Sequence, residues 1–185
     1  MLLLLSSCGG KQKAMGEAIT ERDSLPVMTT LGVTTLISDS GVTRYRVNTE
    51  EWMMYDRKKP SYWAFEKGVY MEQFDSIFNV EASIKADTAY YYDKERLWKL
   101  IGNVDIQNRK GERFNTELLY WNEATQKVYS DKFIRIQQPD RIITGHGFDS
   151  NQQMTIYTIR NIEGIFYVDE EASSGPPQPE TKALP

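Results

Sequence analysis

The chain has 185 residues, of which 40% are hydrophobic and 26% charged, and this composition is typical of a globular domain with its own core. The net charge of −4 argues against a general attraction to phosphate backbones, so we expect no nucleic acid partner. No run of apolar residues approaches the roughly 20 that a membrane-spanning helix requires.

The chain contains one cysteine, Cys8, and therefore cannot form an internal disulfide. Two small residues separate it from the apolar run at residues 1–5. A leucine, two small residues and a cysteine are typical of the lipobox of bacterial lipoproteins, in which the cysteine sulfur carries the lipid. We therefore interpret residues 1–8 as a lipoprotein signal remnant with lipidation at Cys8, although the run is shorter than the usual roughly 7–15 apolar residues. The alternative is a thiol without a role in a loose leader.

Residues 9–30 show no sustained period and are predicted to form a flexible tether. From residue 31 onward, apolar and polar residues alternate in short runs that are separated by turn signals such as Gly41. The domain is predicted to cover residues 31–168. Residues 169–185 are rich in proline and lack aromatic side chains, which favours a disordered tail.

The stretch from Val80 to Ile106 has the clearest pattern. Even-numbered positions up to Tyr90 are apolar or small, and most positions between them are polar. This period of two is that of a β-strand, whereas a helix would need spacings of three and four. A charged cluster at residues 93–96 interrupts the pattern, which resumes at Trp98. The stretch therefore predicts a long β-hairpin with one apolar face.

Turn signals recur at short, regular intervals along the chain, and helix signals are almost absent. A weak internal repeat relates residues 89–106 to residues 118–136. Each unit has an aromatic strand, a charged turn and a strand with alternating apolar residues. These features predict an all-β fold, which could be a sandwich, a barrel or a jelly roll.

The sequence offers little support for catalysis. The single histidine, His146, lies between two glycines and has no second histidine or nearby cysteine with which to bind a metal. No G-x-S-x-G nucleophile elbow and no glycine-rich phosphate loop is present. We therefore predict a protein that is not an enzyme and needs no metal or cofactor. A hydrolase that uses paired carboxylates is a remote alternative.

The apolar face is rich in large side chains. It is either an ordinary packed core or a slot that opens to admit acyl chains, for which each buried methylene contributes about 0.8 kcal/mol. The sequence alone does not separate these interpretations. The candidate groove residues are Trp63, Phe65, Met71, Tyr90, Trp98, Leu100, Leu119, Trp121, Ile134, Ile136 and Phe148.

Residues 97–106 read L-W-K-L-I-G-N-V-D-I. They follow an A-D-x-A-x-Y-Y strand and precede strands that read F-N-T-E-x-L-Y-W and V-Y-S-D-K-F-I-R-I. Together these motifs resemble the LptC family, the lipopolysaccharide export component of Gram-negative bacteria. Residues 62–74 are similar to the lipoprotein version found in Bacteroides-type organisms. Many members are anchored by a transmembrane helix, and the lipobox at Cys8 departs from that pattern.

The resemblance implies an incomplete antiparallel β-jelly roll with two sheets in a V. It also implies a non-enzymatic role at the periplasmic face of the inner membrane, where the chain would be lipid-anchored. There it would accept lipopolysaccharide from an ABC transporter and pass it to an LptA-like periplasmic bridge protein. The alternative is a structural or adhesive envelope lipoprotein with a closed β-sandwich core.

In such a role, neighbouring proteins would add strands to the open edges of the sheets. From the order of the strands along the chain, we expect one edge to face the transporter and the other to face the bridge protein. The first edge would contain Val33, Thr35 and Ile37, and the second Ile156, Thr158 and Phe166.

Overall fold

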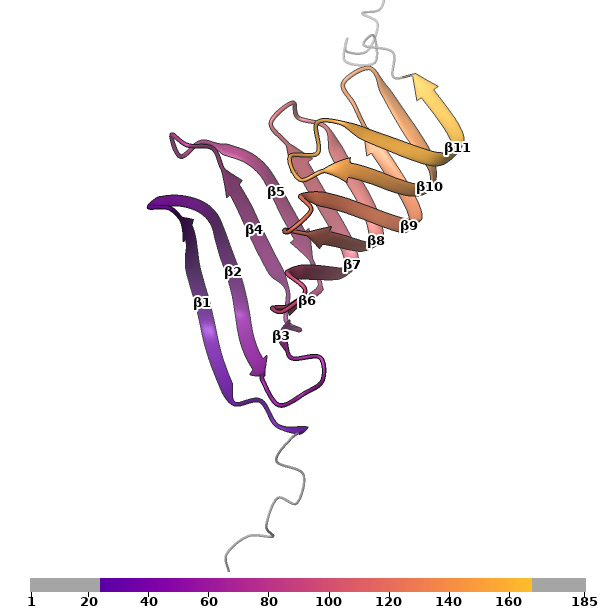
Figure 1. Ribbon diagram of the computed structural model, residues 1–185. Helices are drawn as coiled ribbons and strands as arrows, with labels where there is room; N and C mark the ends of the chain where they lie inside the picture. Colours follow the sequence, from indigo (N-terminus) through magenta and orange to yellow (C-terminus); the bar gives the residue numbers. More distant parts are fainter. Residues whose placement is uncertain (1–23, 168–185) are drawn as a thin grey trace, which may run out of the picture.

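A computed structural model describes residues 24–167 as one antiparallel sheet of 11 strands (Figure 1). The predicted all-β, antiparallel fold is confirmed. Within the described residues, no helix is long and apolar enough to cross a membrane. The strands are β1 (Met28–Asp39), β2 (Val42–Tyr55), β3 (Tyr62–Phe65), β4 (Val69–Phe74), β5 (Val80–Ala86), β6 (Thr88–Tyr92), β7 (Leu97–Asn108), β8 (Arg113–Asn122), β9 (Lys127–Gln137), β10 (Arg141–Asn151) and β11 (Tyr157–Tyr167).

The first strand begins at Met28, inside the range predicted as a tether. The predicted lipidation site Cys8, the first part of the tether and the predicted tail from residue 169 lie outside the described residues. Their assignments therefore remain predictions.

The strands are bent along a line that crosses the sheet, which we call the crease. β3 and β4 are two parts of one bent strand, and β5 and β6 are two parts of another, with Asp87 between them. The backbone N–H of Gly68 donates to the Asp87 carbonyl (2.8 Å), and the N–H of Asp87 donates to the Gly102 carbonyl (3.0 Å). β7, β8, β9 and β10 each carry a register irregularity near their middle, as β-bulges produce. These irregularities lie side by side on neighbouring strands, and the sheet bends along the line that they form.

The crease divides the sheet into two halves that face each other. Half A contains β4 and β5, and half B contains β3 and β6. The other strands cross the crease, so that β2 pairs with β4 through residues 45–49 and with β3 through residues 53–55. Tyr45 in half A contacts Trp121 in half B, with ring centroids 5.1 Å apart. The chain is therefore a folded sheet of the incomplete jelly-roll type, with a V-shaped interior.

Buried hydroxyl groups satisfy carbonyl groups along the crease. The hydroxyl of Thr49 donates to the Gly68 carbonyl (2.8 Å), that of Thr116 to Phe133 (2.7 Å), and that of Ser130 to Leu118 (2.6 Å). A bulge takes backbone groups out of the regular ladder, and such groups are costly when they are buried without a partner. The side chains thus stabilise the bend.

Gly102 shows how tightly the crease is packed. Its φ of +77° favours glycine, and a Cβ atom built there would lie 2.9 Å from Oδ2 of Asp87. That carboxylate also accepts a hydrogen bond from Nδ2 of Asn103 (2.7 Å). Asp87 therefore joins β7 to the break between β5 and β6.

Within the described residues, the sheet has two free edges. β1 pairs with β2 alone, and β11 pairs with β10 alone. The two edge strands lie at opposite ends of the molecule (Figure 1). Their unpaired backbone groups can accept further strands.

Candidate functional site

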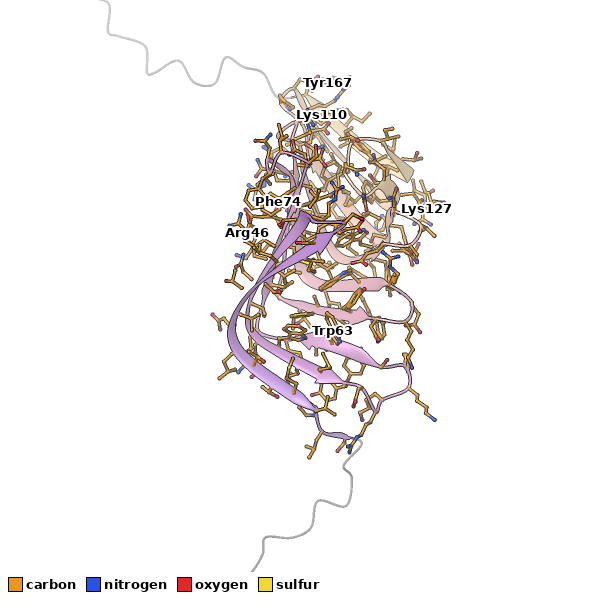
Figure 2. All side chains as sticks on the ribbon, turned by 60° about the vertical axis from the view of Figure 1, so that its left-hand side comes forward. Arg46, Trp63, Phe74, Lys110, Lys127 and Tyr167 are labelled. Carbon is orange, nitrogen blue, oxygen red and sulfur yellow. The ribbon has the colours of Figure 1, made fainter. Side chains whose placement is uncertain are left out.

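The V-shaped interior is the most extensive apolar feature of the described residues. Its side chains come from both halves, because each strand that crosses the crease sends alternate residues inward on both sides of it. Figure 2 shows Trp63 in the space between β1–β2 and the other strands, and Arg46 on the outside. Ten of the candidate groove residues lie in or against this interior: Trp63, Phe65, Met71, Trp98, Leu100, Leu119, Trp121, Ile134, Ile136 and Phe148.

Tyr90 does not line the interior, so its prediction as a groove residue is wrong. It pairs with Ala64 and Lys99 on the opposite face of the sheet, and its hydroxyl donates to Glu66 (3.0 Å). The reason is Asp87, which separates β5 from β6 and shifts the alternation by one residue. The inward positions are consequently even-numbered in β5 and odd-numbered in β6.

Tyr91 takes the inward position instead. Its ring centroid lies 4.7 Å from that of Trp98 and 5.0 Å from that of Trp63. The Tyr91 hydroxyl and the indole N–H of Trp98 donate to the two oxygens of Glu123 (3.2 and 2.9 Å). Burial, together with the charge of Glu123, raises the pKa of Tyr91 to about 12. The group is thus a neutral donor at physiological pH and not a proton carrier.

Several other interior residues were also absent from the predicted groove, among them Trp52, Tyr45 and Met154. Trp52 packs against Trp63 (5.0 Å between centroids), and Tyr45 packs against Trp121. Tyr45 could have been found, because it alternates with Thr43 and Val47 in a predicted strand. Met154 could not, because it follows a turn signal and belongs to no period.

A polar network lies at the rim of half A. The buried Glu112 accepts hydrogen bonds from Nδ2 of Asn108 (2.7 Å), Nε2 of Gln138 (2.6 Å) and the hydroxyl of Tyr157 (3.3 Å). Burial and the charge of Glu112 raise the pKa of Tyr157 to about 12. These groups join the turns that follow β7 and β9 to the start of β11.

The space between the halves is narrow. A cleft of about 40 Å³ opens between Tyr45, Ile84 and Ile106 in half A and Trp121, Val128 and Met154 near half B. A cleft of this size has room for a few water molecules and not for a long acyl chain. The interior is therefore a closed core in this conformation, and an acyl chain can be accommodated only if the halves move apart.

The predicted edge residues occupy two different environments. Val33, Thr35 and Ile37 lie on β1 with their side chains toward Trp52 and Trp63. Thr158 and Phe166 lie on β11, and Ile156 directly precedes it. Ile156 and Phe166 are 74% and 59% exposed. The first set thus belongs both to an edge and to the wall of the interior, whereas the second belongs to the surface.

The remaining candidate, His146, lies on the outer face. Its Nδ1 is 2.7 Å from a carboxylate oxygen of Glu163, and its ring contacts Phe133. Within residues 24–167, no group of three or more histidine, cysteine, aspartate or glutamate side chains is placed to hold a metal ion. The arrangement around His146 is an exposed side-chain hydrogen bond between β10 and β11.

Comparison with known families gives one match. The model of a family described as lipopolysaccharide-assembly, LptC-related, matches residues 12–163. No curated protein matches the chain significantly. The matched range includes all strands from β1 to β10 and most of β11.

Proposed function

Because the chain belongs to the lipopolysaccharide-assembly, LptC-related family, we propose that it is a non-enzymatic carrier of lipopolysaccharide in the cell envelope. In this proposal the acyl chains of the lipid lie between halves A and B. The chain accepts the lipid from an inner-membrane ABC transporter and passes it to a periplasmic bridge protein of related fold.

The observation that carries the proposal is the apolar interior. Aromatic and aliphatic side chains from both halves face it, and the halves are joined at the crease but not by strand pairing at the rims. A V of this kind can widen without breaking its backbone ladder. Each acyl methylene that enters contributes about 0.8 kcal/mol, so a chain of about ten carbons can offset much of the free energy that is needed to separate the halves.

The two edges supply the places for neighbouring proteins. We assign β1 to the transporter side and β11 to the bridge side, with strand addition through the free backbone groups. Both edges expose apolar side chains, among them Leu31 and Leu36 on β1 and Ile162 and Ile165 on β11. Such residues are unfavourable in water and become buried when a partner strand is added. Lipidation at Cys8 would hold the chain at the periplasmic face of the inner membrane.

Site-specific photo-crosslinking in cells tests the proposal. A photoreactive residue at Trp121 faces the interior, and one at the adjacent Tyr120 faces outward, so the pair forms a matched control. We expect lipopolysaccharide adducts at position 121 and none at position 120. The absence of adducts at position 121, while the protein remains folded and at normal abundance, contradicts the proposal.

One observation favours a second candidate function. The interior is nearly closed, as expected for a structural or adhesive envelope protein with a permanent core. In that case positions 120 and 121 both fail to capture the lipid. The same experiment therefore separates the two functions.

A further inference from the structure

The connection between β10 and β11 spans the opening between the two halves. We call residues 152–156 the strap. At its start, the N–H of Gln152 donates to the carbonyl of Gln126 in the turn between β8 and β9, on the rim of half B (3.1 Å). Further along, Nδ2 of Asn108, on the rim of half A, donates to the carbonyl of Met154 (2.8 Å). The strap is thus tied to both rims.

Tyr157, which follows the strap, adds a second tie to half A. Its hydroxyl accepts a hydrogen bond from Nε2 of Gln138 (2.8 Å) and donates to Glu112 (3.3 Å). These partners lie in the turns that follow β9 and β7. Opening the V at this place requires these hydrogen bonds to break or the strap to move together with half A.

Met154 fills the space beneath the strap. Its side chain is 1% exposed and belongs to the hydrophobic core, although the residue lies in a connection and not in a strand. Its φ of +55° is a left-handed conformation, which is unfavourable for a residue with a side chain. Burial of the side chain holds this conformation in place. An unbranched methionine is flexible and fills irregular apolar space, as a short length of acyl chain does.

The cleft beside Met154 has a polar group as well as an apolar wall. Trp121 lines the cleft, and its buried indole N–H has no hydrogen-bond partner within residues 24–167. An unpaired buried donor is costly. The carbonyl or hydroxyl oxygen of an acyl group is an acceptor that could satisfy it.

From these observations we infer that the strap is a gate, and that an acyl chain enters the interior at this cleft by displacing Met154. The inference rests on the proposed function and adds to it the point of access and the residue that blocks it. In the closed state Met154 occupies the interior. In the open state the acyl chain takes its place, and the ties from Asn108 and Tyr157 to the strap region are released.

The test measures lipid uptake and strap opening separately on the full chain. Uptake is followed in stopped flow with a pyrene-labelled long-chain fatty acid and, in parallel, with purified lipopolysaccharide. Opening is followed without lipid by hydrogen exchange at the amides of Gln152 and Met154, which donate to Gln126 and Asn151. The variants are Met154→Ala, which empties the gate, and Tyr157→Phe, which removes one tie. Their matched controls on the outer face are Met53→Ala and Tyr129→Phe.

We expect Met154→Ala and Tyr157→Phe each to raise the uptake rate by about fivefold or more, because the open state gains population. The two controls should leave the uptake rate unchanged. If Met154→Ala does not fold, Tyr157→Phe carries the test.

Two results overturn the inference in different ways. Faster exchange at the strap with an unchanged uptake rate shows that lipid enters elsewhere, and the proposed function survives. If neither the unmodified chain nor any variant takes up either lipid, the proposed function fails, and the gate fails with it.

Discussion

The interior has two ends that are built differently. At the end near β1, which we call the aromatic end, Trp52, Trp63 and Tyr91 pack ring against ring and remain partly accessible. At the other end, which we call the sealed end, Phe114, Ile134, Ile136 and Phe148 are completely buried, and Met154 belongs to the same hydrophobic core. The aromatic end lies beside the strand assigned to the transporter, and the sealed end lies beside β10 and β11.

The difference teaches that separating the halves costs more free energy at the sealed end, where the strap closes the interior, than at the aromatic end. Separating the halves at the aromatic end exposes side chains that already meet solvent in part, and aromatic rings can slide over one another while they stay packed. Separation at the sealed end exposes close-packed apolar surface and breaks the ties of the strap. We therefore expect the sealed end to stay closed unless lipid replaces this packing. The packing of the sealed end should also contribute most of the stability of the fold.

The largest predicted effect compares the two ends directly. Phe148→Ala removes a ring that is 0% exposed and should lower the free energy of unfolding by about 3–5 kcal/mol. Ile37→Ala at the aromatic end removes a side chain that is 37% exposed and should cost less than about 1 kcal/mol. Denaturation in urea measures both values. Equal losses of stability at the two positions would contradict the distinction between the ends.

The next effect concerns the crease. Ser130→Ala leaves the Leu118 carbonyl without its hydroxyl donor and removes the acceptor for the N–H of Lys132 (3.1 Å), and it should cost about 1–3 kcal/mol. The matched control is Ser38→Ala on β1, where the exposed hydroxyl lies 3.4 Å from that of Thr43 and where we expect a change within about 0.5 kcal/mol. Denaturation in urea measures the free energy of unfolding of both variants. A loss of stability at Ser130 no greater than that at Ser38 would show that the buried hydroxyls do not stabilise the bend.

The sequence was sufficient to predict the strands and most of the interior. Alternation within each strand identified Trp98, Leu100, Ile134 and Ile136 as inward residues, because these positions lie in uninterrupted runs on one side of the crease. The motif at residues 97–106 and its neighbours indicated the family, and the family implied the folded, jelly-roll type of sheet.

The crease itself was not predictable from alternation. A bulge changes the inward parity after a single residue, and nothing in the local composition around Asp87 marks it as such a residue. Tyr90 was therefore assigned to the wrong face. The strap was missed for a related reason, because Met154 is buried through contacts with residues distant in sequence such as Asn108, and a pattern read along one strand contains no such contacts.

The smallest predicted effect is the response of the two ends to alkaline pH. The pKa values of Tyr91 and Tyr157 are both raised to about 12, and burial is the largest cause for each. In an unfolded chain a tyrosine titrates near pKa 10. The unfolded chain therefore loses these protons first as the pH rises, and its ionisation favours unfolding. The stability from both groups is fully present below about pH 10 and is lost as the pH rises through about 12.

The two tyrosines should nevertheless differ in what they release. Tyr91 bonds Glu123 within half B, whereas Tyr157 ties the end of the strap to Glu112 and Gln138 on the rim of half A. We expect Tyr91→Phe and Tyr157→Phe each to flatten part of the fall in stability between about pH 10 and 12, as measured by denaturation at a series of pH values. Over the same range, the protection of the strap amides against exchange, taken relative to the base-catalysed intrinsic rate at each pH, should fall in the unmodified chain and in Tyr91→Phe. It should fall much less in Tyr157→Phe, where the tie is already absent. An equal fall in protection in all three proteins would mean that Tyr157 does not hold the strap, and that the sealed end owes its closure to Met154 and Asn108 alone.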